Sequence, residues 1–370
     1  MAKLKIERLE SIDALRGFDM FFVFGGSALF AAVFGLFGLD RGDWLVQQTF
    51  HGVWDGFCHR DTIFPLFLFI AGTTCPFSLS AKRARGVSTC KIVLSTVRRA
   101  VSLVVLGLIV NGLFGLDFAH LRLVSVLGRI GVAWMLAVWL YLLFGVRMRV
   151  VVALLILTGY WALQQFVGAP DCPDAGHFSQ EGNIVCWFDR TFHAGRNYRP
   201  LYDPEGFLGT IPSVVTVMIG VFAGEFLHWR PPHLSETAKC FAMAATGAVL
   251  LTLGFVFSDC CPINKPLWSS TFVLASGGYS LVMLALFHWF VDVRAWHRLA
   301  FPFKVIGVNA IVVFMLQPIV PFSRVAGFFT GGLQNLVGPP GNALIANAGI
   351  VAVNWLILYM LYRQRIFLKV

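Results

Sequence analysis

Ten apolar segments, each long enough to cross a lipid bilayer, constrain the fold of this chain more than any other feature. A spanning helix needs about 20 mostly apolar residues, and the 370-residue sequence is 57% hydrophobic and only 13% charged. The segments cover 14–36, 62–80, 98–116, 123–144, 149–167, 209–228, 239–257, 268–291, 303–321 and 344–362. The sequence therefore predicts an all-α transmembrane helix bundle, a single domain over 1–370 with a polar external loop at 168–206.

The basic residues are divided unevenly between the two sides of this bundle. Ten spans place both termini on one side, and that side holds nineteen of the 29 Lys and Arg residues, among them Lys3, Lys5, Arg8 and Lys369, whereas the other holds eight. Positive residues collect in cytoplasmic loops, so both termini are expected in the cytoplasm. Topology then explains the net charge of +10, and nucleic acid is not expected as a partner. The first span is expected to remain as an anchor, because no small-residue cleavage pattern follows the basic tail.

Four of the eight cysteines fall in the loops expected outside: Cys172, Cys186, Cys260 and Cys261. An oxidising compartment permits disulfides there, so at least one bond among the four is expected, contributing roughly 2 to 4 kcal/mol. The remaining cysteines show no metal-ligand spacing, and no metal is expected.

A few ionisable residues lie at membrane depth, where charge is costly unless it is paired or faces a cavity. Asp13 and Arg16 are three residues apart and can pair on one helical face, with Asp19 a turn deeper. They form either a structural ion pair or the wall of a cavity for a polar ligand. Arg129 needs an anionic partner, for which Asp61 or an anionic ligand is available, unless its side chain snorkels to the surface.

Polar residues crowd the stretch TFHGVWDGFCHRDTIFPLFLFIAG, residues 49–72, just before a spanning segment. Asp61 with Thr62 can cap that helix, but His51 lies ten residues earlier in an outer loop. A loop histidine is usually only solvated. Trp54 and Phe57 would hold this one against a partly dry surface, where imidazole can act as a base or nucleophile near neutral pH.

Five stretches together resemble a known family: SIDALRGFDM, HGVWDGFCHRDTIFPLFLFIAG, LRLVSVLGRIGVAW, YDPEGFLGTIPSVVTVMIGVFAGEFL and INKPLWSSTFVLASGGYSL. They occur in the order seen in the heparan-α-glucosaminide N-acetyltransferases, transmembrane acyltransferases, and are most similar to bacterial relatives that lack the lumenal N-terminal domain. The resemblance implies one transmembrane acyltransferase domain in a bacterial inner membrane. It also implies acetyl transfer from cytosolic acetyl-CoA to an amino sugar or related amine on the far side.

The resemblance assigns roles to individual residues. His51 matches the active-site histidine and Asp61 the aspartate that precedes FP. Other family motifs match at Arg129 in GRIG, at Asp203, Pro204, Glu205 and Gly206 in DPEG, and at Asn264, Lys265 and Trp268 in NKPLW. With Trp54, the residues Asp203, Glu205, Asn264, Lys265 and Trp268 are expected to bind the acceptor, although tryptophans at a membrane boundary more often act as anchors. The chain departs from the lysosomal member at Gly25, Gly26 and Ser27, where that protein has an asparagine.

Acetyl-CoA carries phosphates that favour a basic cytoplasmic face. The expected cofactor-binding residues are Arg16, Arg83, Arg85, Arg98, Arg99 and Arg129. The pantetheine arm would then cross the bundle to His51, which either accepts the acetyl group covalently or deprotonates the attacking amine.

Two other classes of function are compatible with the same composition. A multi-span transporter of a polar or sugar-like solute would also need buried charges, although the sequence shows no repeat and no matched pair of broken helices. A structural or assembly role would leave the polar cluster at His51 unexplained. Membrane lipid and an amino-sugar or glycan acceptor are the expected partners. The acceptor's identity and the oligomeric state stay open, with a homodimer among the options.

Overall fold

We describe the protein from a computed structural model, over residues 9–192, 195–232 and 234–367. Lys3, Lys5, Arg8 and Lys369, which the charge argument used, lie outside these ranges. The described chain is helical and contains no strand, only isolated bridges. Its elements are α1 (Glu10–Phe21), η1 (Phe22–Gly26), α2 (Ser27–Leu36), α3 (Trp44–Gln47), α4 (His59–Thr73), α5 (Cys75–Ala84), α6 (Thr89–Val110), η2 (Leu113–Gly115), α7 (Val126–Leu143), α8 (Val146–Phe166), α9 (Ile184–Phe192), α10 (Thr210–His228), α11 (Glu236–Val256), α12 (Ser270–Phe287), η3 (His288–Val293), α13 (His297–Val308), α14 (Ala310–Leu316), α15 (Phe322–Leu336) and α16 (Gly341–Arg363).

The predicted helical membrane bundle is confirmed. Within the described ranges, nine helices are long and apolar enough to span a membrane, and the bent pair α13–α14 raises the number to ten. The largest boundary error concerns the third span, which was expected over 98–116 but runs Thr89–Val110. Its first turns alternate polar and apolar residues and so escaped an apolar-run criterion. It ends because Gly112 takes a φ of 100°, a conformation that a helix cannot continue through. Helix α15, which packs on α16, was not predicted.

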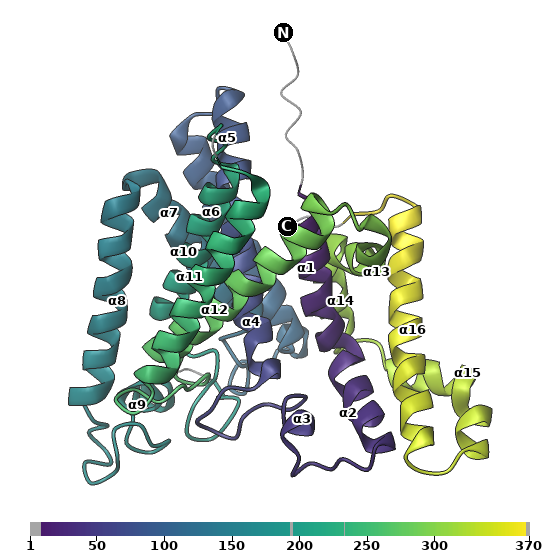
Figure 1. The fold of residues 1–370 in the computed structure, drawn as a ribbon. Coiled ribbons are helices and arrows are strands. Elements are labelled where there is room, and N and C mark those ends of the chain that lie inside the picture. The colour runs from purple at the N-terminus through teal and green to yellow at the C-terminus, as the bar shows by residue number, and fades with distance from the viewer. Residues whose placement is uncertain (1–8, 193–194, 233, 368–370) are drawn as a thin grey trace.

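Helix α1 begins and α16 ends at the same end of the bundle, while α3 and α9 lie at the opposite end (Figure 1). We call these the terminal end and the His51 end. This arrangement fits an even number of spans. The cytoplasmic location of the terminal end stays a prediction.

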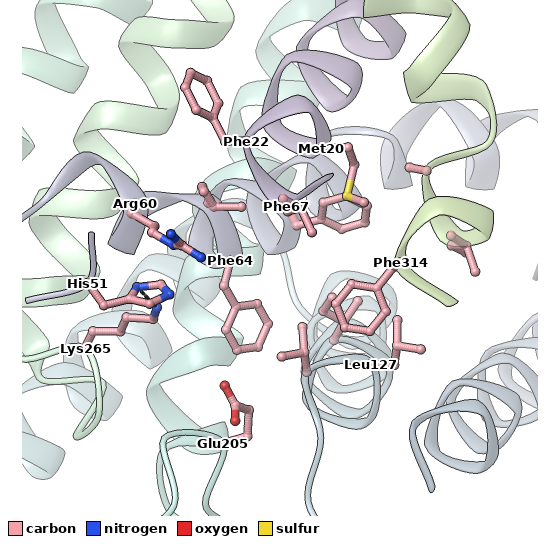
Figure 2. Close-up of a pocket in the computed structure, with 16 residues that line it drawn as sticks. Met20, Phe22, His51, Arg60, Phe64, Phe67, Leu127, Glu205, Lys265 and Phe314 are labelled. Carbon is pink, nitrogen blue, oxygen red and sulfur yellow. Dashed lines mark hydrogen bonds between the residues drawn. The ribbon is translucent and has the colours of Figure 1, made fainter. Parts of the chain in front are cut away.

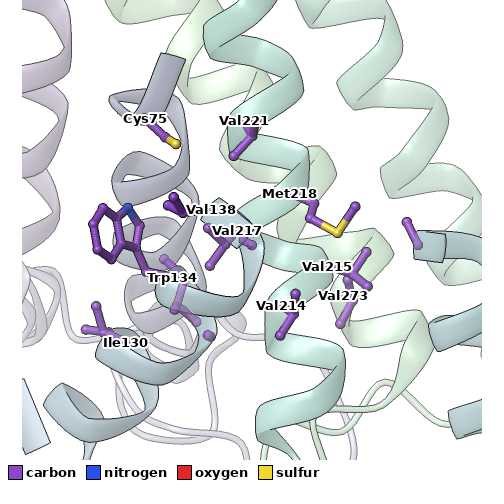
Figure 3. Close-up of a cluster of buried hydrophobic side chains, with 14 of the residues drawn as sticks. Cys75, Ile130, Trp134, Val138, Val214, Val215, Val217, Met218, Val221 and Val273 are labelled. Carbon is purple, nitrogen blue, oxygen red and sulfur yellow. The ribbon is translucent and has the colours of Figure 1, made fainter. Parts of the chain in front are cut away.

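Helices α4, α7, α10 and α12 form the centre of the bundle, and their side chains make up the largest buried apolar cluster (Figure 3). Glycines let α4 and α10 touch at backbone level. A Cβ at Gly72 would lie 2.1 Å from the Val217 carbonyl oxygen, and one at Gly220 would lie 2.0 Å from that of Phe69. Small residues at such crossings are typical of membrane helices, because close packing replaces the hydrophobic effect there.

Two spans are interrupted, although the sequence showed no matched pair of broken helices. The first span passes through the π-helical turn η1, where Gly25 has a φ of 138°. Helices α13 and α14 meet at Asn309 with a bend of 58°. Interruptions of this kind leave backbone groups unpaired at membrane depth, which is tolerated beside protein or a cavity.

The expected disulfide is wrong in this structure. Cys172, Cys186, Cys260 and Cys261 are all free. Cys186 points from α9 into an apolar cluster with Tyr160, whereas Cys261 is buried where its carbonyl accepts a hydrogen bond from Thr271. The two buried thiols therefore belong to different packing environments.

Candidate active site

His51 and Asp61 are brought together by the start of α4. The helix begins at His59, so Asp61 stands in its first turn, where the helix dipole favours a negative charge. Its Oδ1 lies 2.8 Å from His51 Nδ1, and its Oδ2 accepts from the Gly52 N–H at 3.0 Å. The carboxylate is buried, whereas the histidine side chain is 52% exposed. Asp61 therefore fixes the loop and orients an imidazole whose Nε2 is available.

Lys265 is the third member of this cluster. Its Nζ lies 3.0 Å from His51 Nδ1 and 3.3 Å from Asp61 Oδ1. Lysine and aspartate therefore compete for one ring nitrogen. When Nδ1 carries the proton it donates to Asp61, and Nε2 keeps its lone pair and can act as a base. When Lys265 donates to Nδ1 instead, the neutral ring carries its proton on Nε2 and cannot accept another there. The aspartate pairing is thus the one that suits catalysis.

A junction between two loops holds Lys265 in place. Asn264 donates from Nδ2 to Asp55 Oδ1 at 2.9 Å and accepts from the Leu267 N–H through Oδ1 at 2.8 Å. The Gly56 N–H donates to the Ile263 carbonyl at 2.8 Å. Asn264 is fully buried. It therefore ties the 55–56 segment, which follows His51 in the chain, to the loop that supplies the lysine.

Arg129 does not pair with Asp61, which was one of the possible partners for it. Its Nη2 donates to the Gly206 carbonyl at 2.7 Å, and its guanidinium lies 5.0 Å from the centre of the Trp268 ring. Nε and Nη1 are buried with no partner in the described chain, as is Oδ2 of Asp189. Burial, and then the charge of Asp203, raises the pKa of Asp189 to about 7. The hydrogen bond from Arg129 to the Gly206 carbonyl thus anchors the DPEG loop, which begins at Asp203.

Arg122 pairs with both acids of that loop. Its Nε donates to Asp203 Oδ2 at 2.6 Å, and Nη2 contacts Asp203 and Glu205. These two partners raise the pKa of Arg122 despite the cost of burial. The pairing aims Glu205 into the cavity beside His51.

A cavity of about 230 Å³ opens at His51, and we call it the His51 cavity. Figure 2 shows His51, Lys265 and Arg60 on one wall and Glu205 below them, with Phe64, Leu127 and Phe314 around the apolar part. The interrupted helices supply the facing wall, through Met20, Phe22 and Val23 on one side and Ala310, Ile311 and Phe314 on the other.

Two further cavities continue from this one toward the terminal end. The Arg16 cavity, of about 290 Å³, contains Arg16 and Arg99 and shares Phe67, Leu127, Ile130, Ala310 and Ile311 with the His51 cavity. The Lys82 cavity, of about 740 Å³, contains Lys82, Arg98 and Arg99 and so shares Arg99 with its neighbour. The shared lining residues show that the three cavities are neighbours, from the basic region at the terminal end to His51.

The structure divides the predicted cofactor-binding arginines. Arg16, Arg98 and Arg99 line the cavities of the terminal half, and Arg16 also contacts Asp13 at 3.5 Å, as expected. Arg83 and Arg85 are exposed at the end of α5 and line none of the three cavities. Arg129 also lines none of the three cavities, and its guanidinium donates a hydrogen bond to the Gly206 carbonyl. Asp19 is buried in the bundle.

The predicted acceptor-binding residues are divided in the same way. Lys265 and Glu205 line the His51 cavity. Trp54 is half-buried, with its ring against Tyr202 and its Nε1 donating to the Phe178 carbonyl. Asp203, Asn264 and Trp268 have at most 1% of their surface exposed and do not line the His51 cavity, so their contact with an acceptor stays a prediction. They hold the loops that carry Glu205 and Lys265.

Sequence reasoning missed three residues: Arg60, Arg122 and Asp189. Arg60 lies in the polar stretch before the second span and lines the His51 cavity. Arg122 could have been found from the acidic pair in DPEG, because two nearby carboxylates need a cation when buried. No sequence pattern distinguishes Asp189 from other loop acids.

The chain was compared with known proteins. No protein-family model matches it. It is 27% identical to the heparan-alpha-glucosaminide N-acetyltransferases of Mus musculus and Homo sapiens, in each case over an alignment of 421 residues that covers 98% of the chain. It spans about 60% of the length of these curated relatives. This similarity extends over nearly the whole chain and, with the helical membrane bundle, supports the family resemblance that the five sequence stretches indicated.

Proposed function

We propose that this integral membrane protein transfers an acetyl group from acetyl-CoA, entering at the terminal end, to an amine at the His51 end. One observation carries the proposal: an Asp61-oriented imidazole lines the first of three neighbouring cavities, and Arg16, Lys82, Arg98 and Arg99 line the other two. The names of the mouse and human relatives support N-acetyl transfer. An amino sugar is the acceptor class that those names suggest.

The basic end suits the anionic part of the donor. Guanidinium groups bind phosphate in a planar, two-pronged manner, and Arg99 is held over the Trp134 ring at 4.3 Å. The cavity toward His51 is lined mainly by apolar side chains, which suits the uncharged pantetheine arm. The thioester would then meet the acceptor at His51 Nε2.

In the direct route, His51 Nε2 removes a proton as the amine nitrogen attacks the thioester carbon. The C–N bond forms, the C–S bond breaks, and the proton passes from the imidazole to the departing sulfur. Asp61 stabilises the imidazolium, and the Lys265 ammonium lies where it can balance the developing oxyanion. In the covalent route, Nε2 itself takes the acetyl group and the amine attacks afterwards. Both routes need the same Nδ1–H to Asp61 pairing.

Transport of a polar solute is the second candidate. The interruptions at η1 and Asn309 favour it, because broken helices line solute sites in many transporters. Residues beside both interruptions line the His51 cavity, however, so the same features are compatible with a site for acetyl transfer. Transport would also leave the His51–Asp61–Lys265 cluster without a chemical task.

Reconstitution in liposomes separates the two candidates. Acetyl-CoA is supplied at the terminal end and glucosamine at the His51 end, and both free CoA thiol and N-acetylglucosamine are measured. Equal amounts of the two products on opposite sides of the membrane are expected. Uptake of glucosamine without acetylation would establish the transporter instead, and neither activity with any amine would refute the proposal.

A further inference from the structure

A groove beside α2 adjoins the His51 cavity, and the transfer proposed above does not use it. This α2 groove has a volume of about 510 Å³ and lies between α2, the start of α16 and the 39–50 segment. Along α2 its wall consists of small side chains, among them Ala28, Ala31 and Ala32. In Figure 1 these elements meet at the His51 end of the bundle, on the side away from α8 and α9. Such a wall accepts a hydrocarbon chain.

Only a thin partition separates the groove from the site. Thr49 and Phe50 line the groove, the next residue, His51, lines the cavity, and Arg60 lines both. Arg60 Nη1 donates to the Thr49 carbonyl at 3.1 Å. A molecule lying in the groove can therefore contact Arg60, which also lines the His51 cavity.

Two guanidinium groups stand at this partition. Arg41 lines the groove with its guanidinium 4.8 Å from the centre of the Phe50 ring, and Arg60 is the second. Neither forms a salt bridge with a carboxylate anywhere in the described chain. Asp40 also lines the groove, but its carboxylate accepts from the Gly42 N–H at 2.7 Å. Paired arginines beside an apolar wall match a phosphate attached to a lipid chain.

We propose that the acceptor is a lipid amine whose head group carries a phosphate. Its hydrocarbon chain lies in the α2 groove, the phosphate contacts Arg41 and Arg60, and the amine reaches His51 Nε2. A glycerophospholipid with an amino head group and an isoprenoid phosphate bearing an amino sugar share this chemistry. The inference rests on the proposed acetyl transfer and uses its atom balance: the lipid gains a C–N bond, and the amine proton ends on the CoA sulfur.

The test uses the full chain in phosphatidylcholine nanodiscs with labelled acetyl-CoA. Four acceptors are offered separately: phosphatidylethanolamine, a synthetic isoprenyl-phosphate glucosamine, oleylamine, which has no phosphate, and soluble glucosamine. At least one phosphate-bearing lipid should exceed oleylamine by about tenfold, since charge-assisted contacts to phosphate are strong. Which of the two reacts identifies the source.

Two substitutions locate the lipid. Ala31→Trp fills the groove and should lower the ratio of lipid to glucosamine transfer by about tenfold or more, because an overfilled site excludes its ligand. Arg41→Gln should lower the preference for phosphate-bearing lipid over oleylamine by about fivefold, the scale of an exposed ion pair. Leu36→Trp is the matched control, since Leu36 is exposed on the same helix and does not line the groove. It should change neither ratio.

The outcomes are distinguishable. Acetylation of glucosamine without acetylation of any lipid amine would overturn the inference and leave the proposed function intact. Lipid acetylation that Ala31→Trp does not reduce, in a variant with an unchanged melting temperature, would also overturn it. Loss of all transfer in the wild-type protein would refute the proposed function, and the inference with it. A diazirine-tailed phosphatidylethanolamine gives a readout independent of catalysis: it should label α2 in the wild type and not in Ala31→Trp.

Discussion

The two ends of the set of neighbouring cavities hold their charges in different ways. At the His51 end, the acids and bases around the imidazole and the DPEG loop are matched: Asp61 meets His51 and Lys265, and Arg122 meets two carboxylates. Arg41 and Arg60, beside the α2 groove, are exceptions in the described chain. At the terminal end, Lys82 donates to a serine and Arg99 stacks on a tryptophan. Neither forms a salt bridge with an acid of the described chain.

The difference indicates what each end is for. Matched charges keep a fixed geometry, which proton transfer requires. Lys82 and Arg99, which form no salt bridge with an acid of the described chain, gain most from an anionic ligand, which supplies the missing charge. If the proposed function holds, chemistry belongs to the matched end and nucleotide binding to the other end, and substitutions at the two ends should change different kinetic parameters.

The largest effect is expected from His51→Ala. Loss of the imidazole should lower kcat by about 10³-fold or more, near the upper range for acid–base or nucleophilic assistance, with little change in CoA affinity. His120→Ala is a matched control, because His120 is an exposed histidine that contacts Asp117 at 2.9 Å and lines none of the cavities. Initial rates and CoA titrations measure both quantities. Near-normal transfer by His51→Ala would remove His51 from the mechanism.

The next effect concerns the competition for His51 Nδ1. Asp61→Asn should lower kcat by about 10²-fold, within the range for general acid–base assistance, because Lys265 then donates to Nδ1 and the proton moves to Nε2. Adding Lys265→Met to Asp61→Asn should restore part of the lost rate. Transfer rates of the single and double variants measure the coupling. Strictly additive losses would show that the lysine does not influence the tautomer.

Much of the fold could be predicted from sequence, and less of the site. Spans are readable because an apolar run must satisfy its backbone groups as a helix. The His51–Asp61 pair was likewise predicted, from the resemblance and a crowded polar stretch. Burial was not predictable: Trp268 and Asn264 match family motifs, yet they face inward, since a motif does not say whether a residue contacts the substrate or supports one that does. Sequence likewise did not distinguish the arginines that line a cavity from those that do not, because Arg83 near the end of α5 and Arg99 within α6 both lie in basic stretches.

That pair of arginines gives the third prediction. Arg99→Gln should weaken CoA binding by about tenfold, the loss expected for one charge-assisted contact, and leave kcat at saturation nearly unchanged. Arg83→Gln should have little effect, because Arg83 is exposed outside the cavities. Isothermal titration with CoA at two salt concentrations measures both. Equal weakening in the two variants would move the nucleotide to the surface of α5.

The smallest expected effect tests how the matched end is held. Asp189 is buried, and its pKa is raised from 3.8 to about 7. The native protein therefore keeps a proton that the unfolded chain releases near pH 4, so the free energy of unfolding falls as pH rises between those values and then levels off. Asp189→Asn mimics the protonated form, so its free energy of unfolding should not show this slope. Its melting temperature should lie a few degrees above that of the wild type at pH 8 and close to it at pH 5, since about 1 kcal/mol changes the melting temperature by about 2 to 4 °C. Asp171→Asn is the control, because the Arg190 hydrogen bond lowers the pKa of Asp171, and its titration falls below this window. Melting curves in detergent from pH 5 to 8 decide the matter: an unchanged slope in Asp189→Asn would show that Asp189 is ionised in the native protein and paired with Arg129.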